Sequence, residues 1–143
     1  NSEKRYVFVG EEAPGVMGAN YSGDVHVVDI SDIERPREVA FYHVAGAGAH
    51  NFTIDEESGV FYAAFYNGGV RALDVRGNLG TCSDTQRSTD GRCDLKLTGR
   101  EAATALTDVG SVSIWGVAKA GNFVYASDML SGIYKLDVSE LRR

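Results

Sequence analysis

The hexapeptide Val70-Arg71-Ala72-Leu73-Asp74-Val75 occurs in three variants along the chain. The other two copies are VHVVDI at residues 25–30 and IYKLDV at residues 133–138. Each copy has the order apolar, variable, variable, apolar, Asp, apolar, and each follows a turn that contains glycine. A repeated segment of this kind predicts that the chain folds as equivalent structural units.

The repeat has a period of 45 residues once a single insertion is removed. Asp29 and Asp74 are 45 positions apart, whereas Asp74 and Asp137 are 63 positions apart. Arg37 and Arg100 each stand 37 positions before the next motif Asp, so the 18 additional residues lie between Asp74 and Arg100. A period of about 40–50 residues made of short strands is typical of a β-propeller blade.

Each full unit is predicted to contain four short strands. The dipeptide Asn67-Gly68 between two apolar runs is a strong hairpin signal. Residues 100–107 align with residues 37–44 and are expected to form an outer strand, although their alanines would also suit a short helix. The predicted strands of the second unit are residues 51–55, 60–65 and 70–75 and a fourth near 94–97. Those of the third unit are residues 114–118, 123–127 and 133–138.

Neither face of the repeated strand is cleanly polar. One side carries Val70, Ala72 and Asp74, and the other carries Arg71 with two apolar residues. Because a sheet with one solvated face alternates cleanly, we expect sheets that are covered on both faces. The predicted fold is all-β, with four-stranded antiparallel sheets that form about two and a half to three blades of a larger propeller.

The segment VVDISDIERPR at residues 27–37 resembles the LVIVD repeat, whose consensus runs roughly LxVVDVSDPxxPxxV. Residues 49–75 and 124–139 are similar to bacterial members of that family, and the resemblance covers most of the chain outside the insertion. The resemblance implies a β-propeller fold and an exported protein. It says almost nothing about activity, because most members of the family have no known one.

The whole chain is expected to form a partial propeller. Residues 4–10 would be the second strand of a unit without its first strand, and the third unit would lack its fourth. Closed propellers have about four to eight blades, and a stack of repeats needs its end faces covered. We therefore expect a fragment of a longer protein, or a subunit whose end faces are covered by other chains. Within residues 1–143, the expected units are about 1–45, 46–108 and 109–143, with an insertion at 77–99.

Composition and charge limit the classes of function. Glycine is abundant, with 17 residues, and proline is scarce, with 2, which suits many tight turns. The net charge of −6 argues against binding to nucleic acid, which depends on neutralising phosphates. The sequence contains no run of about 18 apolar residues, so no membrane span is expected.

The two cysteines of the chain, Cys82 and Cys93, bracket a polar stretch that is predicted to be a surface loop. We expect them to form a disulfide that stabilises the fold by about 2–3 kcal/mol in the chain-entropy model. A disulfide indicates an oxidising compartment, so the expected location is extracellular, periplasmic or at the cell surface. A zinc site is the alternative, but further ligands at suitable spacing are absent from the sequence.

Candidate ligand-binding residues lie at the start of the innermost predicted strands. His50 and Asn51 open this strand in the second unit, and Trp115 lies at the matching place in the third. In a propeller these strands line the axis, where ligands often bind. Phe52 and Trp115 are assigned to the same repeat position. The alternative is that both rings pack between units and that His50 is simply hydrogen-bonded.

Acidic and histidine residues predict no catalytic or metal centre. The repeated Asp29, Asp74 and Asp137 could ring the axis around a cation, but they are more readily explained as acceptors for the N–H groups of the following turn. The three histidines have no paired ligand spacing, so no metal site is predicted. A calcium loop through Asp84, Asp90 and Asp94 is conceivable, but its spacing does not match the known pattern. We therefore expect no cofactor.

The function favoured by the sequence is a non-catalytic binding or scaffold module, exported, that acts through its loops or faces. The sequence contains none of the motifs G-x-S-x-G, C-x-x-C and H-E-x-x-H. The long loop at residues 11–20 is one possible binding element. The expected partner is another protein or the remaining blades of the same protein. The alternatives are an enzyme fragment with its site at the propeller axis and a subunit of a larger assembly.

Overall fold

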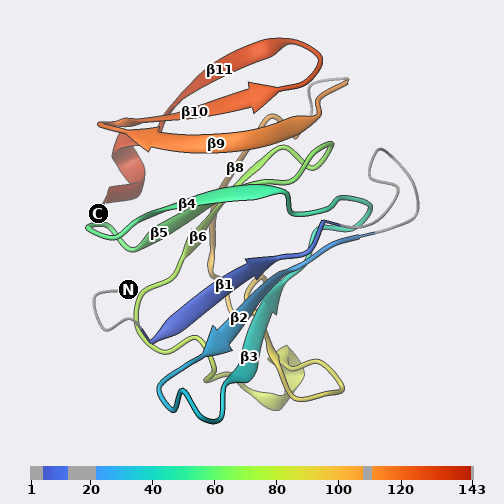
Figure 1. Cartoon of the computed structure of the whole chain (residues 1–143), viewed down its shortest axis with the longest axis vertical. Coiled ribbons are helices and arrows are strands. Elements are labelled where there is room, and N and C mark those ends of the chain that lie inside the picture. The colour runs from blue at the N-terminus through green and yellow to red at the C-terminus, as the bar shows by residue number, and fades with distance from the viewer. Residues whose placement is uncertain (1–4, 13–21, 108–110, 143) are drawn as a thin grey trace.

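The structure, a computed structural model, describes residues 5–12, 22–107 and 111–142. These residues form three β-sheets and two short 3₁₀-helices, and no α-helix occurs among them. Figure 1 shows the sheets stacked one above another, with the first at the bottom and the third at the top. Most of the predicted loop at 11–20 lies outside the described residues.

The strands fall into three groups that follow the chain order, with one exception. The first sheet contains β1 (Tyr6–Gly10), β2 (Val25–Asp29), β3 (Arg37–Tyr42) and β7 (Cys93–Asp94). The second contains β4 (Asn51–Asp55), β5 (Val60–Ala64), β6 (Val70–Asp74) and β8 (Glu101–Ala105). The third contains β9 (Ile114–Ala120), β10 (Phe123–Asp128) and β11 (Gly132–Asp137). The 3₁₀-helices are η1 (Asp84–Gln86) and η2 (Ser139–Arg142).

The sequence repeat is also a structural repeat. The motif strands β2, β6 and β11 each pair antiparallel with the strand before them in their own hairpin. In all three hairpins the motif Asp lies opposite the first residue of that preceding strand. The pairings β2–β3 and β6–β8 also share a register shift at the same repeat position, which is a β-bulge. The strands of the three hairpins therefore occupy equivalent positions in their sheets. The expectation of an all-β fold is confirmed.

Gly69 shows why the hairpin between β5 and β6 requires glycine. Its φ angle is +75°, and a Cβ atom there would lie 2.4 Å from the carbonyl oxygen of Ala105. The Gly69 carbonyl also accepts a hydrogen bond from the N–H of Phe65 at 2.9 Å, which closes the turn. A side chain at this position would push the turn away from β8.

The predicted fourth strand of the second unit was placed wrongly. Residues 93–94 form β7, which pairs in parallel with β3 of the first sheet, and β8 is the fourth strand of the second sheet. The reason is burial: Cys93 and Leu95 lie in the core between the first and second sheets, where Leu79 joins them. The insertion at 77–99 is therefore not only a surface loop. The strand predicted within residues 100–107 is confirmed as β8.

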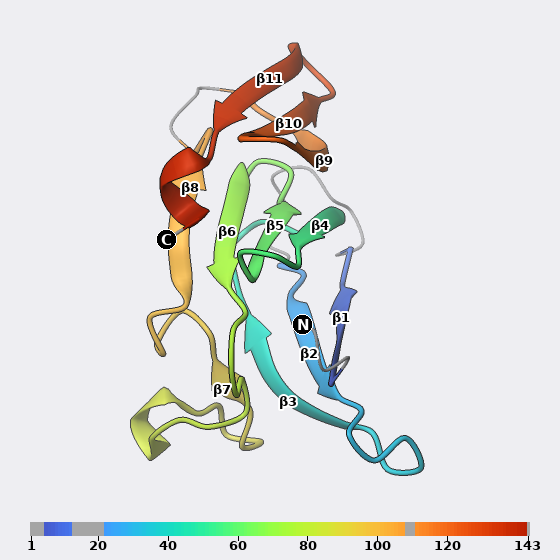
Figure 2. The same cartoon turned by 90° about the vertical axis from the view of Figure 1, so that its left-hand side faces the viewer.

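Two hydrophobic clusters hold the three sheets together. Phe61 and Leu73 of the second sheet pack against the first sheet, whereas Tyr62 packs against the third. Phe61 and Tyr62 are neighbours in the sequence and point to opposite faces, and every residue of β5 is buried. The second sheet is therefore covered on both faces, as Figure 2 shows from the side.

Equivalent residues face the same direction in all three sheets. In β1, Phe8 packs toward the second sheet, and its equivalent Tyr62 in β5 packs toward the third. The next equivalent, Tyr125 in β10, alternates with the buried Val124 and Ala126 and so lies on the outer side of the third sheet. In each sheet, one face thus points toward the preceding position in the stack, and the other face points toward the following position.

This arrangement predicts that one substitution has different effects at equivalent positions. Val124 is fully buried between the second and third sheets, whereas its equivalent Val7 lies on the outer side of the first sheet. We expect Val124→Ala to lower the free energy of unfolding by about 2 kcal/mol, because two buried carbons and their contacts are lost. Val7→Ala should cost less than about 0.5 kcal/mol in a dilute sample. Chemical denaturation measures both, and equal costs would contradict the assigned faces.

Candidate functional site

The outer face of the third sheet exposes several large apolar side chains. Ile133 of β11 is 75% exposed and Tyr125 of β10 is 38% exposed. Trp115 of β9 is 45% exposed at the junction with the second sheet. By repeat position Ile133 corresponds to Val25 and Val70, which are both buried between sheets. The face that is buried in the first two units is therefore open to solvent in the third.

A shallow hollow of about 330 Å³ lies on this face. It is lined by side chains and backbone from β9, β10 and β11, and by Asn51 at the start of β4. Tyr125 and Ile133 supply its apolar wall, and Ser127 and Asn51 supply polar groups. The hollow can accept an apolar side chain of a partner. The polar groups at its rim can form hydrogen bonds with that partner.

The outer face of the first sheet is also partly apolar. Val7 and Val9 of β1 are 42% and 47% exposed, whereas their equivalents Phe61 and Ala63 in β5 are fully buried. The two ends of the stack therefore expose opposite faces of the same repeat. In the interior, faces of these two kinds pack against each other.

The three residues predicted to bind a ligand lie close together. His50 directs Nδ1 at the carbonyl oxygen of Trp115, 2.6 Å away, and the two rings lie against each other at a tilt of 39°, with centroids 4.2 Å apart. The buried Tyr66 ring lies edge-on to both of them. The Tyr66 hydroxyl donates a hydrogen bond to Glu12, whose carboxylate also lies 3.9 Å from His50 Nε2. Asn51 lies beside this cluster, at the rim of the hollow.

This cluster joins the second sheet to the third. Tyr66 and Ile114 exchange backbone hydrogen bonds of 3.0 and 2.9 Å across the junction. Burial first, and then the hydrogen bond to Glu12, raise the pKa of Tyr66, so the phenol stays protonated and keeps donating. His50 therefore holds the backbone of Trp115 in place, and the half-exposed indole lies against the His50 ring at the junction of the two sheets.

Phe52 and Trp115 were wrongly assigned to the same repeat position. Phe52 pairs opposite Ala63, and the residue in the equivalent pairing of the third sheet is Val117, opposite Ala126. The turn between β9 and β10 has two residues where the turn between β4 and β5 has four, which shifts the match by two positions. A register shift near the start of β9 also leaves Trp115 outside the regular pairing. Phe52 consequently packs on Phe61 toward the first sheet, with ring centroids 4.9 Å apart, whereas Trp115 is exposed.

The repeated Asp residues cap the turns that follow their strands, as the sequence predicts. One carboxylate oxygen of Asp29, Asp74 and Asp137 accepts the backbone N–H of the residue two positions later, in each case at 2.9 Å. Asp29 additionally accepts two hydrogen bonds from the Arg5 guanidinium, at 2.8 and 3.0 Å. The Arg5 and Ser31 hydrogen bonds lower the pKa of Asp29 to about 2.

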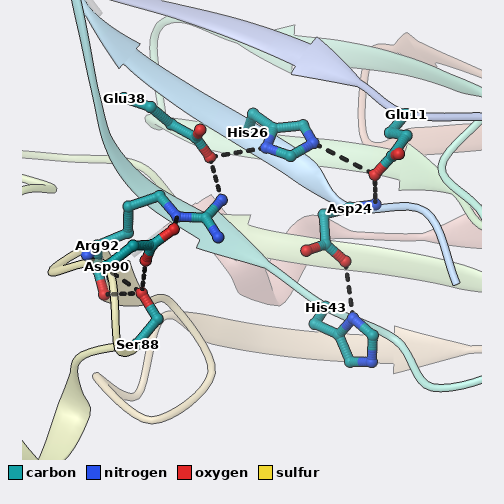
Figure 3. A network of polar contacts seen from close by, with 8 residues as sticks. All are labelled: Glu11, Asp24, His26, Glu38, His43, Ser88, Asp90 and Arg92. Carbon is teal, nitrogen blue, oxygen red and sulfur yellow. Dashed lines mark hydrogen bonds and ion pairs between the residues drawn. The ribbon is translucent and has the colours of Figure 1, made fainter.

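A polar network crosses the outer side of the first sheet, as Figure 3 shows. His26 of β2 lies between two carboxylates, with Nδ1 2.7 Å from Glu38 and Nε2 3.5 Å from Glu11. A neutral imidazole has a single N–H, so it can donate to one of them, whereas a protonated ring can donate to both. Nearby, His43 Nδ1 lies 2.7 Å from Asp24.

Arg92 connects this network to the disulfide-closed insertion. Its guanidinium lies 2.5 Å from Glu38 and 2.8 Å from Asp90, and it stacks over the Phe41 ring at 4.9 Å. Burial raises the pKa of Glu38, but hydrogen bonds from His26 and Arg92 outweigh it and leave that pKa lowered. This contact could not be predicted from the sequence, because Glu38 and Arg92 are far apart in the chain and belong to different units.

The disulfide between Cys82 and Cys93 is present, as the sequence predicts. Within residues 5–12, 22–107 and 111–142, no group of three or more His, Cys, Asp or Glu is arranged to hold a metal ion. Two of the three Asp residues considered for calcium have local roles instead. Asp90 pairs with Arg92, and Asp94 caps the turn that follows β7. Among the described residues, no helix has the length and apolar character needed to cross a membrane.

Comparison with protein-family models, with curated proteins and with solved structures found no match for this chain. The site is therefore assigned from its own geometry.

The Asp29 pKa predicts how stability depends on pH. Because the folded-state pKa of about 2 lies below the usual value of 3.8, the Asp29 carboxylate stabilises the fold above about pH 4 and loses this effect toward pH 2. Asp29→Asn should lower the free energy of unfolding by about 1 kcal/mol at neutral pH, and the difference from the unaltered protein should vanish near pH 2. Urea denaturation over this range measures it, with exposed Glu57→Gln as the control. A difference independent of pH would contradict the assignment.

The Arg92 contacts predict that this side chain orders the insertion. In Arg92→Met, Glu38 and Asp90 lose their shared cation, and we expect a loss of about 1–2 kcal/mol with faster amide hydrogen exchange in residues 83–92. The intact disulfide should keep the effect local. Arg35→Met is a matched control, because Arg35 is an exposed arginine that pairs only at the surface with Asp32. Unchanged exchange in the insertion would show that Arg92 does not anchor it.

Proposed function

We propose that this chain is a non-catalytic binding and scaffold module of an exported, LVIVD-type repeat protein, and that it binds protein through the outer faces of its end sheets. In this proposal the three sheets are propeller-type blades, with units at about 1–45, 46–108 and 109–143. The observation that carries the proposal is the exposure of Ile133 and Tyr125, whose equivalents in the preceding units pack against another sheet.

An open apolar face of this kind is unusual on a protein that acts alone. Contiguous apolar patches that remain exposed on soluble proteins are commonly interaction sites. The patch on the third sheet joins Tyr125 and Ile133, and tyrosine is one of the aromatic residues that carry binding energy at interfaces. The hollow beside them gives a partner side chain a place to insert.

The partner surface that fits best is another sheet of the same repeat. Inside the chain, the face equivalent to Ile133 always packs against the face equivalent to Val7 and Val9.

The residues predicted to bind a ligand have a place in this proposal. Asn51 lines the hollow on the third-sheet face and would contact the partner, and the half-exposed Trp115 is the sequence neighbour of Gly116, which also lines it. His50 would act indirectly, because its hydrogen bond to the Trp115 carbonyl positions the indole. The disulfide supports export, because such bonds form and persist in oxidising compartments.

Self-association of the chain tests the proposal, because one copy carries both kinds of face. We expect sedimentation velocity to show a complex that grows with concentration. Ile133→Asp, on the third sheet, and Val7→Asp, on the first, should each weaken it at least about tenfold, since each places a charge in an apolar contact. An equimolar mixture of the two variants should form a one-to-one complex through the two unaltered faces.

The matched control is Ile33→Asp, because Ile33 is an equally exposed isoleucine in the link between β2 and β3. This variant should associate like the unaltered protein. A chain that remains monomeric at all concentrations would refute binding through these faces. A Val7→Asp variant that still pairs with itself would instead indicate contact between two identical faces, and the proposed orientation would be wrong.

A further inference from the structure

Strand β11 pairs along only one of its edges. It is hydrogen-bonded to β10, and within the described parts of the chain no strand pairs with its other edge. Its equivalents β2 and β6 are paired on that same edge by β3 and β8. The repeat therefore defines where a further strand would lie and in which direction it would run.

The edge of β11 has little of the protection that edge strands usually carry. Unpaired edges are commonly blocked by charged side chains, prolines or bulges. The charged residues within β11 are Lys135 and Asp137. The Lys135 ammonium lies over the Phe123 ring at 3.8 Å, which holds it on the sheet face, and Asp137, at the end of the strand, accepts the backbone N–H of Ser139. The pairing of β11 with β10 is regular over six residues, without a register shift.

An apolar hollow of about 200 Å³ lies beside this edge, between the second and third sheets. It is lined by Ala103 and Ala105 of β8, by Leu136 of β11 and by Leu141 of η2, and Figure 2 shows η2 next to β8. Side chains on alternate positions of a strand added to β11 would point into this hollow. The hollow thus lies beside the position of the additional strand, on the side that faces the second sheet.

The first sheet shows what such a strand covers. Ala40 and Tyr42 of β3 are the equivalents of Ala103 and Ala105, and both are fully buried. The Tyr42 hydroxyl donates a hydrogen bond to Glu101 of β8, so the fourth strand of the second sheet lies over it. Ala103 and Ala105 have no equivalent cover within the described residues and are only half-buried.

We propose that the free edge of β11 binds an extended polypeptide segment, which adds to the third sheet as an antiparallel strand. The segment carries apolar side chains at alternate positions, which fill the hollow, and an arginine at its first position. The arginine is inferred from charge, because Asp137 and Glu140 line the hollow. In the second sheet, Arg100 likewise lies 3.8 Å from the motif residue Asp74. This binding uses an edge and is separate from the face contacts proposed above.

A peptide copied from β3 is the probe. The acetylated and amidated octapeptide REVAFYHV, residues 37–44, has the alternation and the leading arginine that the edge should select. With a fluorescent label, its binding to the full chain is measured by anisotropy. We expect saturable binding with slower amide hydrogen exchange confined to β11. Replacing the peptide's arginine by glutamine (Arg37→Gln) should weaken binding severalfold.

Backbone methylation tests the strand geometry directly. Two further peptides carry N-methyl groups on alternate residues, in opposite phases. One phase removes the N–H groups that face β11 and should weaken binding at least about tenfold, whereas the other removes outward N–H groups and should leave binding nearly unchanged. Equal behaviour of the two methylated peptides would overturn the proposal, because side-chain contacts alone would then explain the affinity.

The Ile133→Asp variant separates this proposal from the face contacts. It should abolish self-association and still bind the peptide, because Ile133 points away from the hollow. Failure of the unmodified peptide to bind would overturn the strand addition and leave the face contacts standing. Protection of β11 that rises with protein concentration in the absence of peptide would also overturn it, since a second copy would then occupy the edge.

Discussion

The fold depends on a sheet that has no polar face. Phe61 and Tyr62 follow each other in β5 and bury their rings on opposite sides, so the second sheet needs a partner on each side. Complete burial of one such ring is worth about 1.5–3 kcal/mol, and these clusters contain many such side chains. The first and third sheets are held in place by this requirement. Because they are built from the same repeat, their outer faces carry apolar residues at the positions that are buried in the interior.

The repeat allowed much of this to be predicted from the sequence. The spacing of Asp29, Asp74 and Asp137 placed the three hairpins correctly, because a residue type that caps a turn recurs wherever the turn recurs. The same logic predicted β8 as a strand against the helix preference of its alanines, since pairing with β6 outweighs local propensity. The disulfide followed from the presence of two cysteines around a polar segment. The candidate residues His50 and Trp115 were also found in contact, although their contact is one between sheets.

The errors arose where a contact is not part of the repeat. The turn between β9 and β10 is two residues shorter than the turn between β4 and β5, so counting back from the motif Asp placed Trp115 where Val117 belongs. The pairing of β7 with β3, and the contact of Arg92 with Glu38, join residues about 50 positions apart in different units. Both are specific to the insertion, so a comparison of one unit with another could not reveal them. The open edge of β11 became visible only when its pairing was compared with that of β2 and β6.

The parallel pairing of β7 with β3 has a consequence for the order in which the chain can fold. Strands β1 to β3 leave the ribosome first, but the strand that completes their sheet follows about 50 residues later, after the whole β4–β6 meander. A domain made of consecutive units would normally finish its N-terminal unit first during synthesis. Here the first sheet must wait, with one edge open, until the second has emerged and the chain has turned back on itself. The first sheet therefore matures late, only after Cys93 and Asp94 of β7 have been synthesised.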